Sequence, residues 1–445
     1  NSPLWGRVGL PREAISKRPA ASAAPLPPPS WPGTSLAWSA QEPRPIPTTA
    51  ATSPSCCWPW PTARHPATKS ETRRHSARWS HSWASRATDA RRSTSHETWP
   101  EKALATFGQQ QGEVFYAARA PSRRQQVWRN LGPVPRGIDR EIVEVFHRTH
   151  MGTDQDPEHI LHHTLRVALG DGWGGSMLGT DLSDVLYGTP RPNTSRANLG
   201  VLEENQVNLV IHGHDPSLSE QITAAVRDPE IIEYAKSKGA EGVNLVGICR
   251  TANEVLMRHG VPSAGNMLHQ ELVILTGAVE ATIVDVQCIM EAVSDVARRF
   301  HTTLITTSAK AKIEGATHIE FDEHNAPSIA RTIVRTAIDN YLNRNGRVRI
   351  PSQFSDLVAG FSHEYIHYMQ GGTYRASFRP LNDAIMAGRI RGAAGVVGCN
   401  NPRVPQDQGI IQVIRELIKN DVLVVVTGCG ALAAGKSGYL TPEMM

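Results

Sequence analysis

The stretch Gln206-Val-Asn-Leu-Val-Ile-His212 decides the fold. It is a short apolar run rich in β-branched residues, which predicts a buried strand, and the apolar spacing of Leu218 to Val226 just after it predicts a helix. The succession of strand and helix continues along the chain. Further strands are predicted at Val243 to Cys249, Leu272 to Val279, Ile283 to Cys288 and Thr302 to Thr307, and helices at Ala252 to His259, Met290 to Phe300 and Pro327 to Tyr341. It resumes with the strand Gly395 to Cys399, the helix Ile410 to Lys419 and the strand Val422 to Thr427. Such alternation is typical of mainly parallel sheets that are covered by helices.

Upstream of this region the pattern is helical. Apolar residues recur at helical spacing from Arg140 to Phe146 and from His159 to Leu169, and a glycine-rich stretch follows from Gly170 to Gly175. The predicted fold class is therefore α/β, with a helical layer followed by two doubly wound, mainly parallel, Rossmann-like domains. We expect the helical domain at residues 103–200, the first α/β domain at 201–348 and the second, incomplete and truncated, at 349–445.

Residues 1–102 differ from the rest of the chain in composition. From Pro47 to Ala103 there is no Leu, Ile, Val, Met, Phe or Tyr, and the first hundred residues hold 16 of the 31 prolines and eight of the ten tryptophans. The segment carries 14 Lys and Arg against 6 Asp and Glu, so a basic arm that binds nucleic acid is one interpretation. A segment so poor in apolar side chains cannot bury a core. We therefore predict an aberrant or disordered leader, such as the product of a shifted reading frame, and no nucleic-acid partner.

Length and composition exclude several classes of protein. A chain of 445 residues, 40% of them apolar, is long enough for about two or three domains. Its longest apolar runs, such as Val422 to Thr427, are far shorter than the ~20 residues needed to cross a bilayer. Six cysteines are too few for a disulfide scaffold. We expect a cytoplasmic protein without a membrane span, whose thiols are free to bind metal or to serve redox chemistry.

The four cysteines outside the leader share one feature, which is that each follows a predicted strand. They are Cys249, Cys288, Cys399 and Cys429, and His212 and His214 follow a strand in the same way. In open α/β sheets ligands bind beyond the carboxyl ends of the strands, so we expect these side chains to converge. Four thiolates and an imidazole suit a soft metal or an iron-sulfur cluster. Because single buried cysteines are common in strands, a purely structural role stays open for each.

A short motif suggests a different metal site. His363-Glu-Tyr-Ile-His367 matches H-E-x-x-H, in which two histidines one helical turn apart share a zinc ion and the glutamate activates water. The pair Gly371-Gly372 predicts that the helix is short, and no third ligand follows nearby. A surface helix that carries two histidines is the competing interpretation, and a zinc hydrolase remains an alternative.

A second motif suggests nucleotide binding. Gly430-Ala-Leu-Ala-Ala-Gly-Lys-Ser437 matches the phosphate-binding pattern G-x-x-x-x-G-K-S and follows a predicted strand. A P-loop needs a helix after the Lys-Ser pair and further strands that carry a magnesium ligand. Only eight residues follow Ser437, and Pro442 is among them. We expect ordinary helix or loop residues here and keep a nucleotide-binding protein as an alternative.

Nine longer motifs carry a family resemblance. They are Met151-Gly-Thr-Asp-Gln-Asp156, Asp171-Gly-Trp-Gly-Gly175, Thr180-Asp-Leu-Ser-Asp-Val-Leu-Tyr-Gly-Thr-Pro190, Ala197-Asn-Leu-Gly-Val-Leu-Glu203, His212-Gly-His-Asp-Pro216, Gly247-Ile-Cys-Arg-Thr-Ala-Asn-Glu254, Val284-Asp-Val-Gln-Cys288, Gly398-Cys-Asn-Asn-Pro402 and Thr427-Gly-Cys429. With these motifs in this order, residues 103–445 resemble the nickel-iron-sulfur carbon monoxide dehydrogenases of anaerobic metabolism.

The resemblance implies oxidation of CO with water to CO2, two protons and two electrons at a cluster of nickel, four irons and sulfide. His214 corresponds to the histidine on the iron outside the cubane, and Cys288, Cys399 and Cys429 to the cysteines on the cubane irons. The resemblance also implies [4Fe-4S] relay clusters, a ferredoxin-like electron acceptor and a homodimer. Asp171 falls where the family places a carboxylate near the cluster, so it is our candidate catalytic acid or base, with a turn-forming aspartate as the alternative.

The chain departs from the family pattern at several positions. Family members usually have two adjacent cysteines where this chain has Cys249-Arg250, and a guanidinium cannot ligate a metal. We count Cys249 as a substitute metal ligand. The cysteines of the relay clusters would fall in the leader, and the nickel-binding cysteine and catalytic lysine beyond Met445. We therefore expect this chain to be inactive in CO oxidation, and a cluster-binding protein without CO chemistry is a further alternative.

Overall fold

The structure, a computed structural model, describes residues 99–344, 346–375, 377–401 and 403–444. The prediction for the leader therefore lies almost wholly outside the described residues. No described helix is both long enough and apolar enough to span a membrane.

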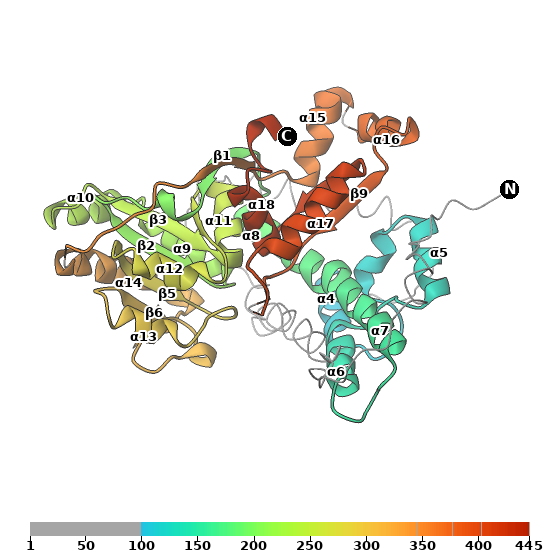
Figure 1. The fold of residues 1–445 in the computed structure, drawn as a ribbon, viewed down its shortest axis with the longest axis horizontal. Coiled ribbons are helices and arrows are strands. Elements are labelled where there is room, and N and C mark those ends of the chain that lie inside the picture. The colour runs from blue at the N-terminus through green and yellow to red at the C-terminus, as the bar shows by residue number, and fades with distance from the viewer. Residues whose placement is uncertain (1–98, 345, 376, 402, 445) are drawn as a thin grey trace, which may run out of the picture.

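A helical layer opens the described part of the chain, drawn in blue-green in Figure 1. Its helices are α4 (Trp99–Gly108), α5 (Ser122–Leu131), α6 (Ile138–Arg148), α7 (Pro157–Gly170) and α8 (Met177–Tyr187). Its core is formed by Phe107, Val114, Tyr116, Ile138 and Leu178, among others. The glycine-rich stretch forms a π-helical turn, Asp171–Ser176, that joins α7 directly to α8. Such turns occur frequently at functional sites, and this one carries Asp171.

One eight-stranded sheet forms the centre of the first α/β unit. Its strands are β1 (Asn193–Ala197), β2 (Val207–His212), β3 (Val243–Ile248), β4 (Ser263–Gly265), β5 (Val279–Val284), β6 (Thr303–Thr306), β7 (Thr317–His318) and β8 (Ser355–Ala359). They lie in the order β7-β6-β5-β2-β3-β4-β1-β8, and all neighbours are parallel except β1 and β8. From β2 the chain extends the sheet one way through β3 and β4, and the other way through β5, β6 and β7. The sheet is therefore doubly wound, as the sequence predicts.

Helices cover both faces of this sheet. They are α9 (Pro216–Ala225), α10 (Pro229–Ser237), α11 (Cys249–His259), α12 (His269–Leu275), α13 (Val293–Ala297) and α14 (Ala326–Asn340). Successive residues of a strand face opposite sides, so Leu209 and Ile211 pack with Ile222 of α9, whereas Val210 packs with Ile274 of α12. All six residues of β2 are buried, Asn208 and His212 included, so this strand is covered on both faces and shows no alternation of buried and exposed residues.

A second, smaller α/β unit follows β8, in orange and red in Figure 1. It consists of α15 (His363–Arg375), α16 (Arg379–Met386), β9 (Gly392–Val396), α17 (Gln408–Lys419), β10 (Val422–Val426) and α18 (Gly428–Lys436). Strands β9 and β10 pair in parallel, and Ile411, Ile414, Ala433 and Ala434 form the core beneath them. Helix α18 also packs on α11 of the first unit. Short 3-10 turns lie at Phe115–Arg119, Leu199–Val201, Ala309–Ala311, Glu323–Asn325, Tyr341–Asn343 and Pro442–Met444.

The structure differs from the sequence-based assignment in several places. The strands predicted at Ile283 to Cys288 and Gly395 to Cys399 end earlier, at Val284 and Val396. The helix predicted at Met290 to Phe300 spans only Val293–Ala297. Leu272 to Val279 was predicted as one strand, but α12 continues to Leu275 and β5 begins only at Val279. Val273 and Ile274 are buried while Leu272 and Leu275 are exposed, a helical pattern that a short apolar run conceals. The large sheet also takes β1 from before residue 201 and β8 from after residue 348. It thus extends past both domain boundaries predicted from the sequence.

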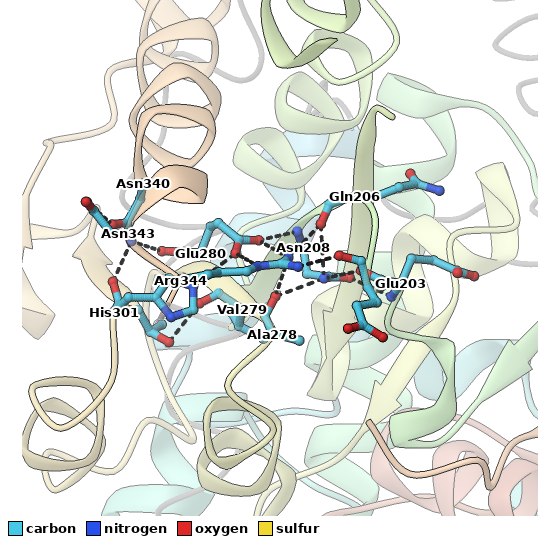
Figure 2. A network of polar contacts seen from close by, with 12 residues as sticks. Glu203, Gln206, Asn208, Ala278, Val279, Glu280, His301, Asn340, Asn343 and Arg344 are labelled. Atoms are coloured by element: carbon cyan, nitrogen blue, oxygen red, sulfur yellow. Dashed lines mark hydrogen bonds and ion pairs between the residues drawn. The ribbon is translucent and has the colours of Figure 1, made fainter. Parts of the chain in front are cut away.

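A buried polar network ties together the amino ends of the central strands (Figure 2). Glu280 of β5 is fully buried, and its Oε1 accepts from Arg344 Nε at 2.5 Å and from His301 Nε2 at 3.0 Å. Its Oε2 accepts from Arg344 Nη2 at 3.0 Å and from the backbone N–H of Asn208 at 2.6 Å. Arg344 also donates to three backbone carbonyls around it. The network therefore fixes the segment that leaves α14 against β2 and β5.

Asp184 of α8 ties the helical layer to the first α/β unit. Its Oδ1 lies 2.8 Å from Nη2 of Arg258 on α11, and Nη1 of Arg258 lies 2.5 Å from Glu254. Burial raises the pKa of Asp184 to about 7 despite the nearby guanidinium of Arg258, and the charges of Glu364 and Glu254 add to the rise. This carboxyl thus takes up a proton in the neutral range.

We expect the free energy of unfolding to fall as the pH rises from about 4 to about 7, because the folded state there keeps a proton on Asp184 that the unfolded chain, with a pKa near 3.9, has released. The stabilisation of the folded state that comes from protonation of Asp184 is fully present below about pH 4 and is lost above about pH 7. Asp184→Asn cannot ionise, so its stability should change less with pH than that of the parent chain. Urea unfolding of both proteins in this pH range measures the difference. Equal pH slopes would contradict the assignment.

Candidate metal centre

The predicted metal-binding residues lie at the carboxyl edge of the large sheet, where β2, β3 and β5 are neighbours. His212 ends β2, His214 lies two residues further on, Cys249 follows β3 directly, and Cys288 lies four residues beyond β5. The strand order reverses at this edge, which is the usual location of ligands in an open α/β sheet. The remaining two cysteines reach the same hydrophobic cluster from the smaller unit, after β9 and β10.

The four thiols form a closed ring of side-chain contacts, which we call the thiol ring. Cys249 contacts Cys288 and Cys429, and Cys399 contacts the same two residues. Hydrogen bonds from Cys249 and Cys399 lower the pKa of Cys288 and Cys429, while the same contacts raise the pKa of the two donors. All four cysteines are free of disulfides. The four thiols thus influence one another's protonation, and the thiolate is the form that binds metal.

The backbone at the ring is left-handed at or beside every cysteine. Cys249 has φ 61° and Cys288 has φ 63°, and Gly398 (φ 119°) and Gly428 (φ 61°) precede the other two. At residues other than glycine such a conformation costs of the order of 1–3 kcal/mol and persists only where the surroundings hold it in place. Four separate loops therefore turn sharply beside the ring, two of them at cysteines, where the conformation is strained.

Three buried carboxamides hold the backbone of the thiol ring, and the sequence analysis missed them. They are Asn253, which donates to the carbonyls of Cys249 (3.0 Å) and Gly428 (3.1 Å), Gln270, which donates to that of Cys288 (3.1 Å), and Asn266, which donates to that of Cys429 (3.3 Å). None is more than 6% exposed. One sequence signal was the position of Asn253, one helical turn after Cys249. It is a weak signal, because asparagine and glutamine are mostly exposed in proteins.

Replacement of Asn253 by leucine should weaken metal binding at the ring. Leucine has a similar volume but no donor, so two buried carbonyls lose their partner and the loops of Cys249 and Cys429 are no longer linked. Loss of such a supporting hydrogen bond typically costs about 10–100-fold in metal affinity. The effect is measured as the amount of iron that the variant and the parent chain each retain in the presence of a chelator. Asn130→Leu, at an exposed position on α5, is the control and should behave as the parent chain does.

His214 is held in one orientation at the same edge. Its Nδ1 lies 3.2 Å from the carbonyl oxygen of Val286 and donates to it, which leaves Nε2 as the nitrogen that can bind a metal. Its backbone N–H donates to Asp285 Oδ1 at 2.7 Å, and its ring contacts Cys288. Glycine is required at residue 213 (φ 149°), because a Cβ there would lie 1.8 Å from the carboxylate of Asp285.

His212 is more deeply buried than its neighbour. It is 1% exposed, and neither ring nitrogen has a hydrogen-bond partner in the described part of the chain. Complete burial lowers its pKa to about 4, although the charge of Cys288 opposes the shift. Buried polar groups without a partner are rare in folded proteins. His212 is therefore a neutral imidazole beside the thiol ring with both nitrogens unused.

Asp171 lies within electrostatic reach of Arg250, the residue after Cys249. Burial raises the pKa of Asp171, while a hydrogen bond from Ser176 Oγ at 3.1 Å and the charge of Arg250 oppose the rise. The guanidinium of Arg250 lies 3.9 Å from Glu254. The position next to Cys249 is thus occupied by a cation that lies near Glu254 and acts on the charge of Asp171. Asp171 stands on a helical turn and not in a loop.

The thiol ring is too open for a single metal ion. Thiolates on one tetrahedral ion, with bonds of about 2.3 Å, lie about 4 Å from one another. Within the described ranges, the one group of three ligand atoms that all lie within 4.8 Å of each other is Glu141, Glu144 and His163 in the helical layer. No three thiols of the ring meet this condition.

The group in the helical layer has a different explanation. Arg136 Nε lies 2.8 Å from Glu141, and Arg148 Nη2 lies 2.8 Å from Glu144. Hydrogen bonds from these two arginines offset burial and lower the pKa of Glu144 to about 2. Because the carboxylates are already paired with cations, this group is an ion-pair network within the helical layer.

The H-E-x-x-H motif does not form a metal site with a third ligand. Helix α15 continues through Gly371 and Gly372, so the predicted short helix is wrong. The rings of His363 and His367 stack with centroids 6.1 Å apart, and both lie against Phe378. No third ligand atom of the described residues joins them within 4.8 Å. The pair is part of a surface helix, in agreement with the competing interpretation.

The G-x-x-x-x-G-K-S match is not a phosphate-binding loop. Residues 428–436 form α18, so the backbone N–H groups of the motif lie within a helix. The ammonium group of Lys436 lies 2.6 Å from Asp407 and 3.0 Å from Asn266. This lysine therefore ties α18 to the first α/β unit, beside the carboxamide that holds Cys429.

Comparisons with known proteins agree with one another. The profile of the Prismane/CO dehydrogenase family matches residues 66–445. Carbon monoxide dehydrogenase 1 of Methanosarcina mazei is 53% identical over 341 residues, which are 76% of this chain and 54% of that protein. Carbon monoxide dehydrogenase 2 of Carboxydothermus hydrogenoformans is 43% identical over 343 residues, again 76% of this chain and 54% of that protein. The chain thus spans about half the length of these curated relatives.

The similarity extends to solved structures. A nickel-free carbon monoxide dehydrogenase from Thermococcus sp. AM4 superimposes with a TM-score of 0.74 at 42% identity, covering 92% of this chain and 64% of that one. Carbon monoxide dehydrogenase IV of Carboxydothermus hydrogenoformans superimposes with a TM-score of 0.72 at 39% identity, with the same two coverages.

Proposed function

Because this chain belongs to the Prismane/CO dehydrogenase family, we propose that its described domains form the cluster-holding part of a carbon monoxide dehydrogenase. The reaction is the oxidation of CO with water to CO2, two protons and two electrons. The observation that carries this proposal is the thiol ring, with Nε2 of His214 beside it, at the carboxyl edge of the doubly wound sheet. A ferredoxin-like protein as electron acceptor and a homodimer complete the proposal.

The donors at this edge fit a metal-sulfur cluster. Thiolates and neutral imidazoles are the ligands that soft metals and iron-sulfur clusters prefer. We assign Cys288, Cys399, Cys429 and His214 as ligands, with Cys249 as a further thiolate. A nickel-iron-sulfur cluster bound here supplies the metal that binds CO and the path by which two electrons leave.

Two residues of the chain prepare the edge for this chemistry. The carbonyl of Val286 fixes the tautomer of His214, so Nε2 is the nitrogen left free to bind a metal. Asp171 has a raised pKa through burial, and Ser176 holds its carboxylate at 3.1 Å. A carboxylate of raised pKa is a better proton acceptor than an exposed one. We assign Asp171 as the group that receives a proton when water is consumed.

A chimaera tests the function without relying on this chain alone. Residues 103–445 replace the matching segment of the Methanosarcina mazei relative and carry Arg250→Cys. After anaerobic reconstitution with iron, sulfide and nickel, we expect CO-dependent reduction of methyl viologen. The same chimaera with Cys399→Ser and Cys429→Ser is the control and should show none. If the first chimaera binds iron and nickel but does not oxidise CO, the proposed function is wrong.

A further inference from the structure

A buried lysine belongs to a polar network beside the thiol ring. Lys436 ends α18 with a side chain that is 9% exposed, and its ammonium group lies 2.6 Å from Asp407 Oδ2 and 3.0 Å from Asn266 Oδ1. Lysines are almost never buried unless they are paired in this way. Because the G-x-x-x-x-G-K-S match is not a phosphate-binding loop, the burial of this lysine needs another explanation.

Asp407 connects this lysine to the loop of Cys399. Its Oδ1 accepts from Asn400 Nδ2 at 2.8 Å, and its backbone N–H donates to Asn400 Oδ1 at 2.6 Å. Asn400 is 5% exposed and directly follows Cys399 in the chain. The two reciprocal hydrogen bonds hold residues 400 and 407 together. Asp407 therefore fixes the backbone just beyond Cys399.

The conformation of Asp407 indicates that its carboxylate serves this network and not α17. It is the residue before α17, where an aspartate usually accepts a hydrogen bond from the first turn of the helix. Here the side chain makes no such bond, and the backbone is left-handed (φ 65°). This conformation is uncommon at residues other than glycine and persists only where the surroundings hold it. Lys436, Asn266 and Asn400 hold the carboxylate in its place.

Lys436 also orients the carboxamide that holds Cys429. The ammonium group donates to Asn266 Oδ1, and Gln406 Nε2 donates to the same oxygen. A carboxamide has one accepting oxygen and one donating nitrogen. With its oxygen turned to these two donors, Asn266 directs Nδ2 to the carboxylate of Asp407 at 2.9 Å and to the carbonyl of Cys429 at 3.3 Å. Loss of the cation removes one of the two donors that select this orientation.

From these contacts we propose that Lys436 is a positioning residue for the metal-sulfur cluster. Its bond to Asp407 fixes the loop of Cys399. Its bond to Asn266, which directly follows β4, fixes the loop of Cys429 against the first α/β unit. The proposal rests on the proposed function in taking these two cysteines as ligands, and it adds no ligand to that set. One buried cation thus sets the spacing of the two thiolates that the smaller unit supplies.

The spacing of these two thiols can be measured without any metal. Cys399 and Cys429 contact each other, and a full chain in which the other four cysteines are serine keeps only this pair. One equivalent of a dipyridyl disulfide reacts with one thiol, and the second thiol then closes a disulfide. Two thiols are oxidised, and the reagent is reduced to two thiopyridones that take up the two protons. Release of the second thiopyridone gives the rate of closure.

In this background Lys436→Met should slow disulfide closure by about 10-fold or more, because loops that no longer share a cation bring the thiols together less often. Lys436→Arg keeps a cation that can donate to both partners, so it should recover part of the rate. The matched control is Lys419→Met, which removes an exposed lysine of α17 that pairs with Glu416 at the surface. It should close at the parent rate. Circular dichroism shows whether each variant folds.

Cluster retention is the second measurement. The full chain with all its cysteines is reconstituted anaerobically with iron and sulfide, and its iron content is followed in the presence of a chelator. We expect Lys436→Met to bind the cluster about 10–100-fold more weakly than the parent chain does. Asp407→Asn keeps the shape of the side chain but not its charge, and it should behave in the same way. Lys419→Met should retain iron as the parent chain does.

The outcomes separate a positioning role from a structural one. If Lys436→Met closes the disulfide at the parent rate, the lysine only stabilises the fold and the proposal is overturned. Equal cluster retention by Lys436→Met and the parent chain also overturns it. If Lys436→Met does not fold, Asp407→Asn decides by the same two measurements. A parent chain that takes up no cluster contradicts the proposed function, while the rate of disulfide closure still tests the role of Lys436.

Discussion

Replacing Arg344 with methionine is expected to lower the free energy of unfolding by about 3–5 kcal/mol, because it removes the only guanidinium that compensates the buried carboxylate of Glu280 among the described residues. Glu280 is fully buried, so its charge cannot be solvated by water after the change (Figure 2). The three backbone carbonyls that accept from Arg344 lose their donor as well. Urea unfolding of the cluster-free chain, followed by circular dichroism, measures the loss.

Two further variants separate charge from packing in this network. Arg344→Lys keeps a cation but loses the planar fork that binds both oxygens of Glu280, so it should be destabilised less than Arg344→Met. The double variant Arg344→Met with Glu280→Gln removes both charges and should recover part of the stability. A loss of less than about 1 kcal/mol for Arg344→Met would show that water reaches Glu280 and that the network is not structural.

Arg250→Cys in the chimaera is expected to raise the rate of CO oxidation on the order of 100-fold or more over the otherwise identical chimaera with arginine. Arg250 places a cation where the family resemblance expects a thiolate, and a guanidinium cannot replace a metal ligand. Misplacement of reacting groups by about 1 Å already costs about 100-fold in rate. The measurement is viologen reduction under CO, together with iron and nickel content of both proteins.

Arg250→Ser is the matched control for this comparison. It removes the positive charge without adding a thiol, so its rate should remain near that of the arginine protein. A serine variant as active as the cysteine variant would show that the charge of Arg250, and not the lack of a thiolate, limits the reaction. Equal rates for arginine and cysteine would mean that residue 250 has no part in the cluster.

The doubly wound sheet could be predicted because its central strands are buried on both faces. Such strands are mostly apolar along their length, as in β2 and β3, and the helices after them show a clear apolar spacing. β1 and β8, the last two strands on one side of the sheet, escaped prediction because each has only one buried residue. Edge strands carry a weak hydrophobic signal, so the domain boundaries drawn from the sequence lay inside the sheet.

The candidate site was only partly predictable for a similar reason. Thiols and imidazoles are rare side chains with specific chemistry, so Cys249, Cys288 and His214 stood out once strands were placed before them. The carboxamides of Asn253, Gln270 and Asn266 did not, because asparagine and glutamine are common and nothing in a sequence tells a buried amide from an exposed one. Their role depends on which carbonyls lie within about 3 Å, a property of the packed loops.

By itself the sequence determined the alternation of the central strands with helices, the placement of four thiols and two histidines at or beyond strand ends, and the departure at Arg250. Those features follow from local periodicity and residue chemistry, which a linear chain already contains. Only the tertiary structure decided that Cys249 closes the thiol ring while Arg250 turns to Glu254, and that the H-E-x-x-H and G-K-S motifs are ordinary helix. The physical reason is that a ligand set is defined by distances between loops far apart in the chain, and packing of both α/β units sets those distances.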